Sequence, residues 1–250
     1  MSAFAPSAPA PHHPSAEMNL PFEDRVPQGY YDRAMNARGI QSTWHRQKFE
    51  RVRKAMGDFE RHLDIACGPG TFISMLGGER SVGVDLATAQ VAYASRTHGG
   101  SGSRWIACAA DALPFAPDSF DVVTSIELIE HITEEAALTM LETVREVLRD
   151  GGRLVLTTPN FRSPWLLLEP LVSVLGEVDY RIEHITRYDR TSLRSLLERA
   201  GFRDVAVTRF QLAGPFLAPF GQRLADGAAR CGTLGLEARM GCLLLAEAQK

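Results

Sequence analysis

Short apolar runs alternate with amphipathic stretches along most of this chain, from about residue 60 onward. Short apolar runs are typical of buried strands, whereas apolar positions spaced three and four residues apart are typical of helices. Strands are predicted at 61–66, 81–85, 103–108, 120–126, 152–158, 203–210 and 240–247. Because helices fill most of the gaps between these strands, we expect βαβ units, a largely parallel sheet and right-handed crossovers, and therefore an α/β fold.

The clearest predicted helix covers residues 133–149, with Thr133 as its cap and Gly151-Gly152 as its end. Its inward positions have the spacing of one apolar helix face: Leu138, Leu141, Val144 and Leu148. A second helix is predicted at 190–200, and residues 214–236 form a partly helical segment that contains several prolines and glycines.

Three segments fall outside the regular alternation. Residues 1–27 are rich in Ala, Pro and Ser, so we expect a disordered tail before one domain at 28–250. Residues 161–188 are too apolar for a solvated connection, so we expect a small cap over a pocket, with a packing helix pair as the alternative. Residues 28–57 are predicted to be an N-terminal helical element. In it, Ser42 or Thr43 caps a helix with one apolar face at Trp44, Phe49, Val52 and Met56.

Composition narrows the class of protein and of partner. The chain has 250 residues, of which 45% are hydrophobic and 23% are charged, and its net charge is −3. These values are typical of a soluble globular protein and provide no reason to expect a nucleic acid or a membrane as partner. The four cysteines form no CxxC pair, and there is neither a signal peptide nor an apolar stretch of roughly 20 residues. We therefore expect free thiols and a cytoplasmic protein, monomeric or homodimeric, that acts on a small molecule.

The stretch at 62–72 combines a short buried strand, a glycine turn and the start of a helix. Gly68 and Gly70 allow a tight turn whose backbone can approach a ligand closely, with helix N–H groups pointing into the same pocket. A dinucleotide fingerprint would need a third glycine three residues after Gly70, where the chain has Ile73. The turn is therefore not expected to bind a pyrophosphate, which disfavours a nicotinamide-dependent dehydrogenase.

Single acidic residues recur near the ends of the predicted strands: Asp64, Asp85, Asp111 and Glu127. In an open α/β sheet the carboxyl ends of parallel strands form one crevice, so we expect these carboxylates to line it. A carboxylate at the end of the second strand can accept both hydroxyls of a ribose, and one after the third strand suits the amino edge of an adenine. The glycine turn leaves room for a sulfonium linkage where a pyrophosphate would otherwise lie.

Together these motifs resemble those of class I S-adenosylmethionine-dependent methyltransferases. Residues 64–70 resemble the family's glycine motif, although Ala66 stands where the family commonly has glycine, and residues 118–132 and 151–160 resemble its fourth- and fifth-strand motifs. The resemblance implies a Rossmann-like sheet of seven strands in the order 3-2-1-4-5-7-6, with helices on both faces and an antiparallel last strand at 240–247. It also implies S-adenosyl-L-methionine as cofactor. The implied cofactor contacts are Arg46, Asp64, Ala66, Gly68, Gly70, Asp85, Leu86, Asp111, Ala112, Ile126 and Glu127.

Glu127, Glu130 and His131 form a second candidate group. If a helix begins at about residue 127, their spacing places all three on one face, where they can bind a divalent cation such as Mg²⁺. The stretch is similar to the metal-binding stretch of ubiquinone-pathway O-methyltransferases and small-RNA 2′-O-methyltransferases. Those families supply a further histidine from beyond strand five, and His184 occupies a comparable place here. The alternatives are a metal-free site with His131 as general base, and a structural role.

We therefore expect a methyltransferase that transfers a methyl group from S-adenosyl-L-methionine to a small-molecule acceptor, with a hydroxyl oxygen as the favoured atom. His131 and Glu130 are the expected catalytic residues, because removal of a hydroxyl proton needs a base or a cation beside the acceptor. The alternatives are N- or C-methylation of a small molecule without a metal, and a non-catalytic protein that binds S-adenosylmethionine.

Overall fold

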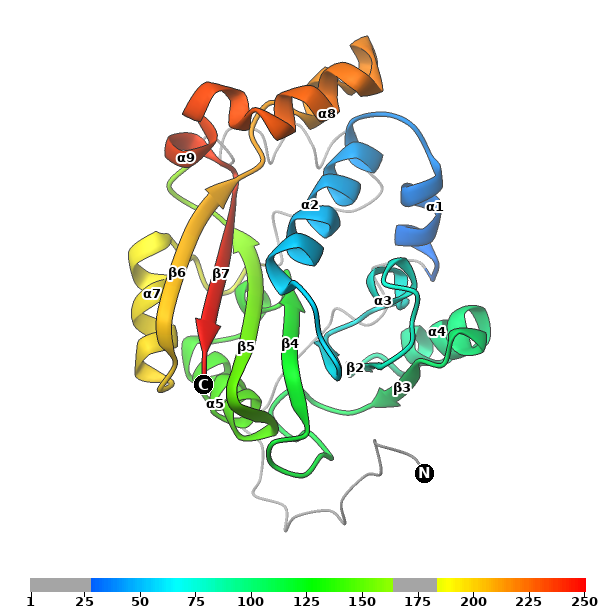
Figure 1. The fold of residues 1–250 in the computed structure, drawn as a ribbon, viewed down its shortest axis with the longest axis vertical. Helices are drawn as coiled ribbons and strands as arrows, with labels where there is room; N and C mark the ends of the chain where they lie inside the picture. The colour runs from blue at the N-terminus through cyan, green and yellow to red at the C-terminus, as the bar shows by residue number, and fades with distance from the viewer. Residues whose placement is uncertain (1–27, 164–183) are drawn as a thin grey trace.

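The computed structural model describes residues 28–163 and 184–250, which form a seven-stranded sheet with helices on both faces (Figure 1). The strands are β1 (His62–Ile65), β2 (Ser81–Asp85), β3 (Arg104–Ala107), β4 (Phe120–Ile126), β5 (Leu148–Pro159), β6 (Arg203–Phe210) and β7 (Leu243–Gln249). The α-helices are α1 (Tyr30–Asn36), α2 (Ile40–Met56), α3 (Thr71–Met75), α4 (Thr88–His98), α5 (Glu134–Val147), α7 (Arg190–Arg199), α8 (Gln222–Arg230) and α9 (Glu237–Met240). Short 3-10 helices include η3 (Ile129–His131), η5 (Pro215–Phe220) and η6 (Gly232–Gly235).

The strands are ordered β3-β2-β1-β4-β5-β7-β6, which confirms the predicted topology. β1 pairs in parallel with β2 and β4, and the order of the strands reverses at β1. β7 runs antiparallel to both β5 and β6, as expected for the last strand. Ligands bind in open α/β sheets where the strand order reverses, so this topology places the candidate site at the carboxyl end of β1.

Neighbouring residues of β4 point to opposite faces of the sheet and so belong to two different cores. Val123 packs in the larger core with α5 and α7, whereas Val122 packs in the smaller core with Phe49, Val52 and Met56 of α2. Side chains alternate across a strand, so a central strand that is apolar on both faces requires a helical layer on each side. The apolar face predicted for residues 44–56 is therefore the face that covers the sheet.

Two predicted helix boundaries differ from the structure. α2 begins at Ile40 after Gly39, so Ser42 and Thr43 lie inside the helix and do not cap it. α5 ends at Val147, before Gly151-Gly152, because Leu148 already pairs with Phe120 at the start of β5. Thr133 is the N-cap of α5 as predicted, with its side chain accepting a hydrogen bond from the backbone N–H of Ala136 at 3.2 Å.

Two predicted segments cannot be compared with the structure, whereas the predictions for the cysteines can. The tail at 1–27 and most of the cap at 161–188 lie outside the described residues. All four cysteines are free thiols, as expected. Within 28–163 and 184–250, no helix is long and apolar enough to cross a membrane.

The turn after β1 holds a residue in a conformation that favours glycine. Ala66 has a φ of 57°, the left-handed region in which a Cβ is strained, at the position where the resembling family commonly has glycine. Gly68 and Gly70 follow with φ of 53° and 80°, so three of five consecutive residues adopt positive φ. Of these three residues only Ala66 has a Cβ, so only Ala66 is strained by the shape of the turn.

Replacing Ala66 with glycine is expected to stabilise the protein, since the left-handed conformation costs a residue with a Cβ about 1 kcal/mol or more. That gain corresponds to a rise of about 2–4 °C in thermal midpoint for a domain of this size. Ala92→Gly, on an exposed position of α4, is the matched control and should lower the midpoint, because glycine weakens a helix interior. A lower midpoint for Ala66→Gly would contradict the strain assigned to this turn.

Candidate functional site

A cavity opens at the carboxyl ends of β1, β2 and β4 and is closed on its other side by α1 and α2. Eight of the residues predicted from the sequence line it: Asp64, Ala66, Gly68, Asp85, Leu86, Ile126, Glu127 and His131. Tyr31 of α1 and Lys48 and Phe49 of α2 complete the wall. Three of the four strand-end carboxylates predicted from the sequence, Asp64, Asp85 and Glu127, therefore line one cavity, whereas Asp111 does not.

Asp85 ties the glycine turn to the end of β2. Its Oδ2 accepts a hydrogen bond from the backbone N–H of Gly68 at 2.7 Å, and its Oδ1 accepts one from Ala87 at 2.9 Å. Hydrogen bonds to a carboxylate are short and strong, so Asp85 fixes the position of the turn backbone. A carboxylate can accept several hydrogen bonds at once, so this anchoring is compatible with contacts to ligand hydroxyls.

A chain of buried polar side chains runs from β2 to Asp64. His62 contacts Ser81 Oγ through Nδ1 at 3.1 Å and Thr124 Oγ1 through Nε2 at 2.8 Å, and Thr124 donates to Asp64 Oδ1 at 2.5 Å. Since the Thr124 hydroxyl hydrogen goes to Asp64, His62 must donate from Nε2 and accept from Ser81 at Nδ1. Burial lowers the pKa of His62 to about 3, so the imidazole is neutral, as this pattern requires.

Asp64 is a buried carboxyl at the wall of the cavity. Burial, and secondly the charge of Asp85, raise its pKa to about 7, although the hydrogen bond from Thr124 acts in the opposite direction. Removing a carboxylate from water favours its neutral form unless a positive charge lies close by. Asp64 is therefore poised to become ionised when a cation occupies the cavity.

An ion pair between a buried lysine and a partly buried glutamate lies on the α2 side of the cavity. The ammonium of Lys48 is 3.7 Å from Glu127 Oε2, and Thr157 donates to Glu127 Oε1 at 3.0 Å. The side chain of Lys48 is only 4% exposed, which is unusual for a lysine. A buried lysine next to a cavity that also contains carboxylates offers a positive charge to an anionic part of a ligand.

Glu130, His131 and His184 form a second group beyond β4. Each offers one ligand atom, and these atoms lie within 4.8 Å of one another. Thr158 donates to Glu130 Oε2 at 2.8 Å, and the Glu130 carbonyl accepts from the backbone N–H groups of Ile185 and Thr186. Burial, followed by the charge of Glu127, raises the pKa of Glu130 well above its ordinary value, whereas burial lowers that of His184 to about 4.

The local backbone differs from the helix that was predicted to begin at residue 127. Glu127 has a φ of 57° and precedes the single-turn helix η3, so its side chain does not share a face with Glu130 and His131. Glu127 turns toward Lys48 and Thr157, and His184 joins the other two residues in its place. The sharp turn at the end of β4 separates residues that are close in the sequence.

Six predicted site residues do not line the cavity: Arg46, Gly70, Asp111, Ala112, Glu130 and His184. Arg46 donates to Thr43 Oγ1 at 3.2 Å, and the cation at the wall is Lys48, two residues further along α2. A helix turns by about 100° per residue, so two positions separate the cavity side of α2 from its outer side. The phase set by Phe49 in the predicted apolar face was the signal that could have identified Lys48.

Sequence reasoning also missed α1 as a wall of the site. Tyr31 lines the cavity, and the next residue, Asp32, fastens α1 to the body of the domain. Thr71 and Tyr93 donate to the Asp32 carboxylate at 2.7 Å and 2.9 Å, and His98 lies 3.1 Å from the same group. No local motif marks Asp32, because its partners come from α3 and α4 and meet it only in the folded chain.

Comparison with known proteins gives the family. A family model described as "Methyltransferase domain" matches residues 63–156. The chain is 31% identical to a demethylmenaquinone methyltransferase of Beutenbergia cavernae over 189 residues, 67% of this chain and 75% of that protein. It is 30% identical to a ubiquinone biosynthesis O-methyltransferase of Idiomarina loihiensis over 58% of this chain and 62% of that protein. The chain spans less than two thirds of the length of several curated relatives that it matches.

The fold is similar to that of an S-adenosylmethionine-dependent methyltransferase from Thermotoga maritima, described as a possible histamine N-methyltransferase. The TM-score is 0.67 at 17% identity, and the match covers 92% of this chain and 97% of that one. Together with the sequence relatives, this shows that the chain belongs to the class I S-adenosylmethionine-dependent methyltransferases.

The family implies S-adenosyl-L-methionine as cofactor, and the residues of the cavity fit it. A Cβ added at Gly68 would meet no atom within 4 Å, so the turn backbone faces open space. Asp111 does not line the cavity but directly follows Ala110, which does. Its Oδ1 is buried without a hydrogen-bond donor in the part of the chain that the structure describes, and an adenine amino group would supply one. Asp85 would receive ribose hydroxyls, and Lys48 would meet the methionine carboxylate. These four residues would hold the cofactor.

Asp64→Asn should stabilise the ligand-free protein more at pH 8 than at pH 5. The native carboxyl, with its pKa raised to about 7, keeps a proton that the unfolded chain releases, so wild-type stability falls as pH rises toward 7. The asparagine variant has no such loss, and its advantage should grow by on the order of 2–3 kcal/mol between the two pH values. Thermal unfolding at both pH values measures this, and a constant or shrinking difference would contradict it.

Proposed function

We propose that this methyltransferase transfers a methyl group from S-adenosyl-L-methionine to a hydroxyl oxygen of a small organic acceptor. The observation that carries the proposal is His131, the single imidazole among the described residues that line the cavity. A neutral imidazole has a nitrogen that can accept a proton, which suits a general base. The name of one relative, a ubiquinone biosynthesis O-methyltransferase, supports oxygen as the acceptor atom.

The cofactor, when bound, supplies a methyl group that its sulfonium already activates. The chain must then orient the acceptor, exclude water and receive the hydroxyl proton. His131 lies at the cavity wall with its side chain 10% exposed, so its ring is accessible from the cavity but shielded from bulk water. His184 packs against it with ring centroids 5.4 Å apart, and its pKa of about 4 keeps it neutral beside a protonated His131.

Glu130 is proposed to position His131. Its Oε1 is 3.9 Å from His131 Nε2, which is too far for a hydrogen bond, and its side chain is 1% exposed. Its contacts to Thr158 and to the backbone at 185–186 hold the loop after β4 against the end of β5 and the start of α7. The position of the imidazole depends on this loop, so Glu130 acts through His131.

We also propose that the acceptor is a small molecule and that the protein is cytoplasmic. We further propose that it is a monomer or a homodimer and does not bind nucleic acid. The net charge of −3 supports the exclusion of nucleic acid, because a polyanion needs a basic groove. We propose in addition that residues 161–188 form a small cap over the cavity. N- or C-methylation without a metal is the alternative reaction, and a non-catalytic protein that binds the cofactor is the alternative class.

A second candidate mechanism uses a divalent cation at Glu130, His131 and His184. The observation that favours it is that one carboxylate and two imidazoles offer ligand atoms within 4.8 Å of one another. Carboxylate ligands suit Mg²⁺ and Mn²⁺, and imidazole ligands suit Zn²⁺. Glu127, which was expected to be a fourth ligand, lies outside this group and pairs with Lys48. A cation here would lower the pKa of an acceptor hydroxyl in place of the imidazole base.

Turnover with a panel of acceptors tests the reaction. Catechols, phenols, amines and carbon acids are each incubated with the protein and S-adenosyl-L-methionine, and S-adenosylhomocysteine formation is measured. A hydroxyl acceptor should give turnover, and His131→Asn should lower its kcat by about 100- to 10,000-fold with S-adenosylhomocysteine affinity retained. Turnover with amines alone would replace oxygen by nitrogen. Cofactor binding without turnover on any acceptor would favour the non-catalytic protein.

Thermal midpoints of chelator-treated protein with S-adenosylhomocysteine, with and without Mg²⁺ or Mn²⁺, distinguish the two mechanisms. A bound ion stabilises the native state, so the cation mechanism predicts a metal-dependent rise that Glu130→Gln abolishes. Glu135→Gln, at an exposed position of the first turn of α5, is the control and should keep the rise. We expect no rise in either protein if His131 acts as a metal-free base.

A further inference from the structure

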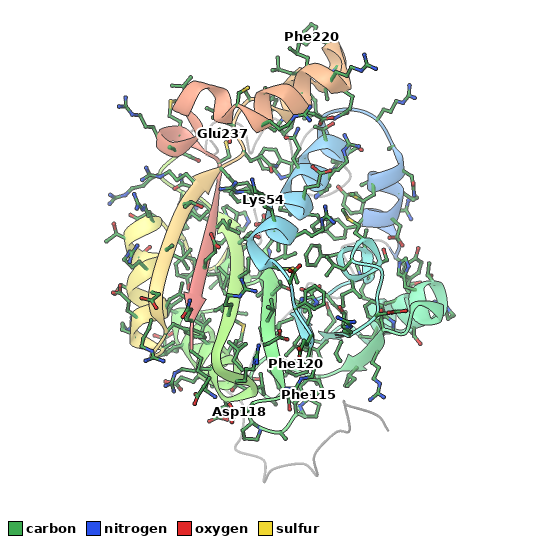
Figure 2. All side chains as sticks on the ribbon, in the orientation of Figure 1. Lys54, Phe115, Asp118, Phe120, Phe220 and Glu237 are labelled. Carbon is green, nitrogen blue, oxygen red and sulfur yellow. The ribbon has the colours of Figure 1, made fainter. Side chains whose placement is uncertain are left out.

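Exposed apolar side chains are concentrated on the outer segment at residues 214–241. This segment contains η5, α8, η6 and α9, which lie along one end of the molecule (Figure 1). Phe220 is 80% exposed, Leu224 53%, Leu236 48% and Met240 43%. Single exposed apolar residues are common, but these four follow one another along one segment, and Phe220 projects from the outermost end of the fold (Figure 2).

The exposed charges of this segment are all positive. Arg223, Arg230 and Arg239 are exposed, whereas the segment's two carboxylates are partly buried and accept hydrogen bonds. Gln222 donates to Asp226 at 2.7 Å, and the backbone N–H of Leu212 donates to Glu237 at 3.4 Å. The chain as a whole has a net charge of −3, so this local excess of arginine is not a property of the surface in general.

The inner side of the segment is fixed to α2. Thr43 Oγ1 donates to Gln222 Oε1 at 3.1 Å, and Gln47 Nε2 donates to the carbonyl of Ala225 at 3.2 Å. Trp44 packs edge-on against Phe216, with ring centroids 6.5 Å apart. These contacts fix η5 and α8 to α2, so Phe220 and Leu224 cannot turn into the core without breaking them.

We propose that this arginine–apolar face, formed by Phe220, Leu224, Leu236 and Met240 with Arg223, Arg230 and Arg239, docks on the surface of an anionic lipid bilayer. Arginine binds phosphate groups through paired N–H donors, and apolar side chains beside it enter the boundary between headgroups and acyl chains. The sequence repeats this combination, since an arginine and an apolar residue follow Phe220 and Leu236 at the third and fourth positions.

Charge complementarity favours a lipid surface over a second copy of the chain. In a two-fold symmetric dimer the same surface patch meets itself, so the three arginines of one copy would face those of the other. Lipid phosphates supply the opposite charge instead. Nothing in the composition predicts this surface, because the net charge of −3 would by itself repel the protein from an anionic membrane.

Docking at this face would bring the reaction cavity close to the bilayer. α2 carries both the contacts to α8, at Thr43 and Gln47, and the cavity residues Lys48 and Phe49. The segment that carries the docking face is therefore connected to the cavity wall through a single helix. An acceptor dissolved in the membrane would have a short path to the cavity, although docking itself does not depend on the proposed reaction.

Flotation of the full-length chain with vesicles tests the proposal. Vesicles of phosphatidylcholine alone are compared with vesicles that also contain phosphatidylglycerol. The protein should float with the anionic vesicles, and added salt should weaken the binding. The triple variant Arg223→Gln/Arg230→Gln/Arg239→Gln and the double variant Phe220→Ser/Leu224→Ser should each lower the partition coefficient by about tenfold or more.

A matched control removes the same number of positive charges from another part of the surface. Arg53→Gln/Arg80→Gln/Arg96→Gln replaces three exposed arginines away from the segment and should keep binding within about twofold. Unchanged S-adenosylhomocysteine binding shows that each variant is folded. Equal binding to both kinds of vesicle, or equal loss in both triple variants, would overturn the proposal. Concentration-dependent self-association that Phe220→Ser/Leu224→Ser abolishes, without vesicle binding, would assign the face to a second copy.

Discussion

The hydrogen bonds between Asp85 and the glycine turn are the constraint on which the site depends. They join the loop after β1 to the loop after β2, so that Gly68 and Ala87 are held by one carboxylate. The turn is packed at Gly70, where a Cβ would collide with the Trp105 ring, but at Gly68 a Cβ would contact nothing within 4 Å. A turn that is open at Gly68 needs an anchor outside itself, and Asp85 provides it. The carboxylate that we propose as the ribose contact is therefore also the one that fixes the turn.

The cavity wall combines groups whose charge depends on what the cavity contains. Asp64 is a buried carboxyl with its pKa raised to about 7, whereas Lys48 and Glu127 form a partly buried pair at 3.7 Å. A cofactor that carries both a sulfonium and a carboxylate would compensate both kinds of buried charge. The polar chain from Ser81 through His62 and Thr124 fixes Asp64 in position without adding charge, because its histidine is neutral.

Two strained residues lie where neighbouring strands end at the cavity. Ala66 after β1 and Glu127 after β4 both have a φ of 57° and both line the wall. A residue with a Cβ adopts this conformation only where surrounding contacts impose it, and such residues are concentrated at functional sites. At Glu127 the consequence is chemical, because the turn directs its carboxylate toward Lys48 and separates it from Glu130. The ion pair and the imidazole group are therefore two distinct features of one cavity.

The strands could be predicted because short apolar runs alternate regularly with helical spacings. Their order was an implication of the resemblance to the methyltransferase family, and the structure confirms it. Asp64, Asp85 and Glu127 could be placed at the cavity for a topological reason: the carboxyl ends of neighbouring parallel strands must meet. The helix predicted from residue 127 was wrong, since a spacing of three and four residues fits a helix but does not require one. The caps assigned to Ser42 and Thr43 were wrong because Gly39 already begins α2.

The sequence by itself determined the strands, through local periodicity, and the carboxylates at the edge of the sheet, through the rules of α/β topology. The order of the strands followed from the resemblance of its motifs to a known family. The tertiary structure decided that Glu127 lies outside the group of Glu130 and His131 and pairs with Lys48 instead. It also decided that Asp32 fastens α1 beside the cavity, and that four apolar side chains at the far end remain exposed. Contacts between distant segments depend on packing angles, and no local pattern encodes those angles.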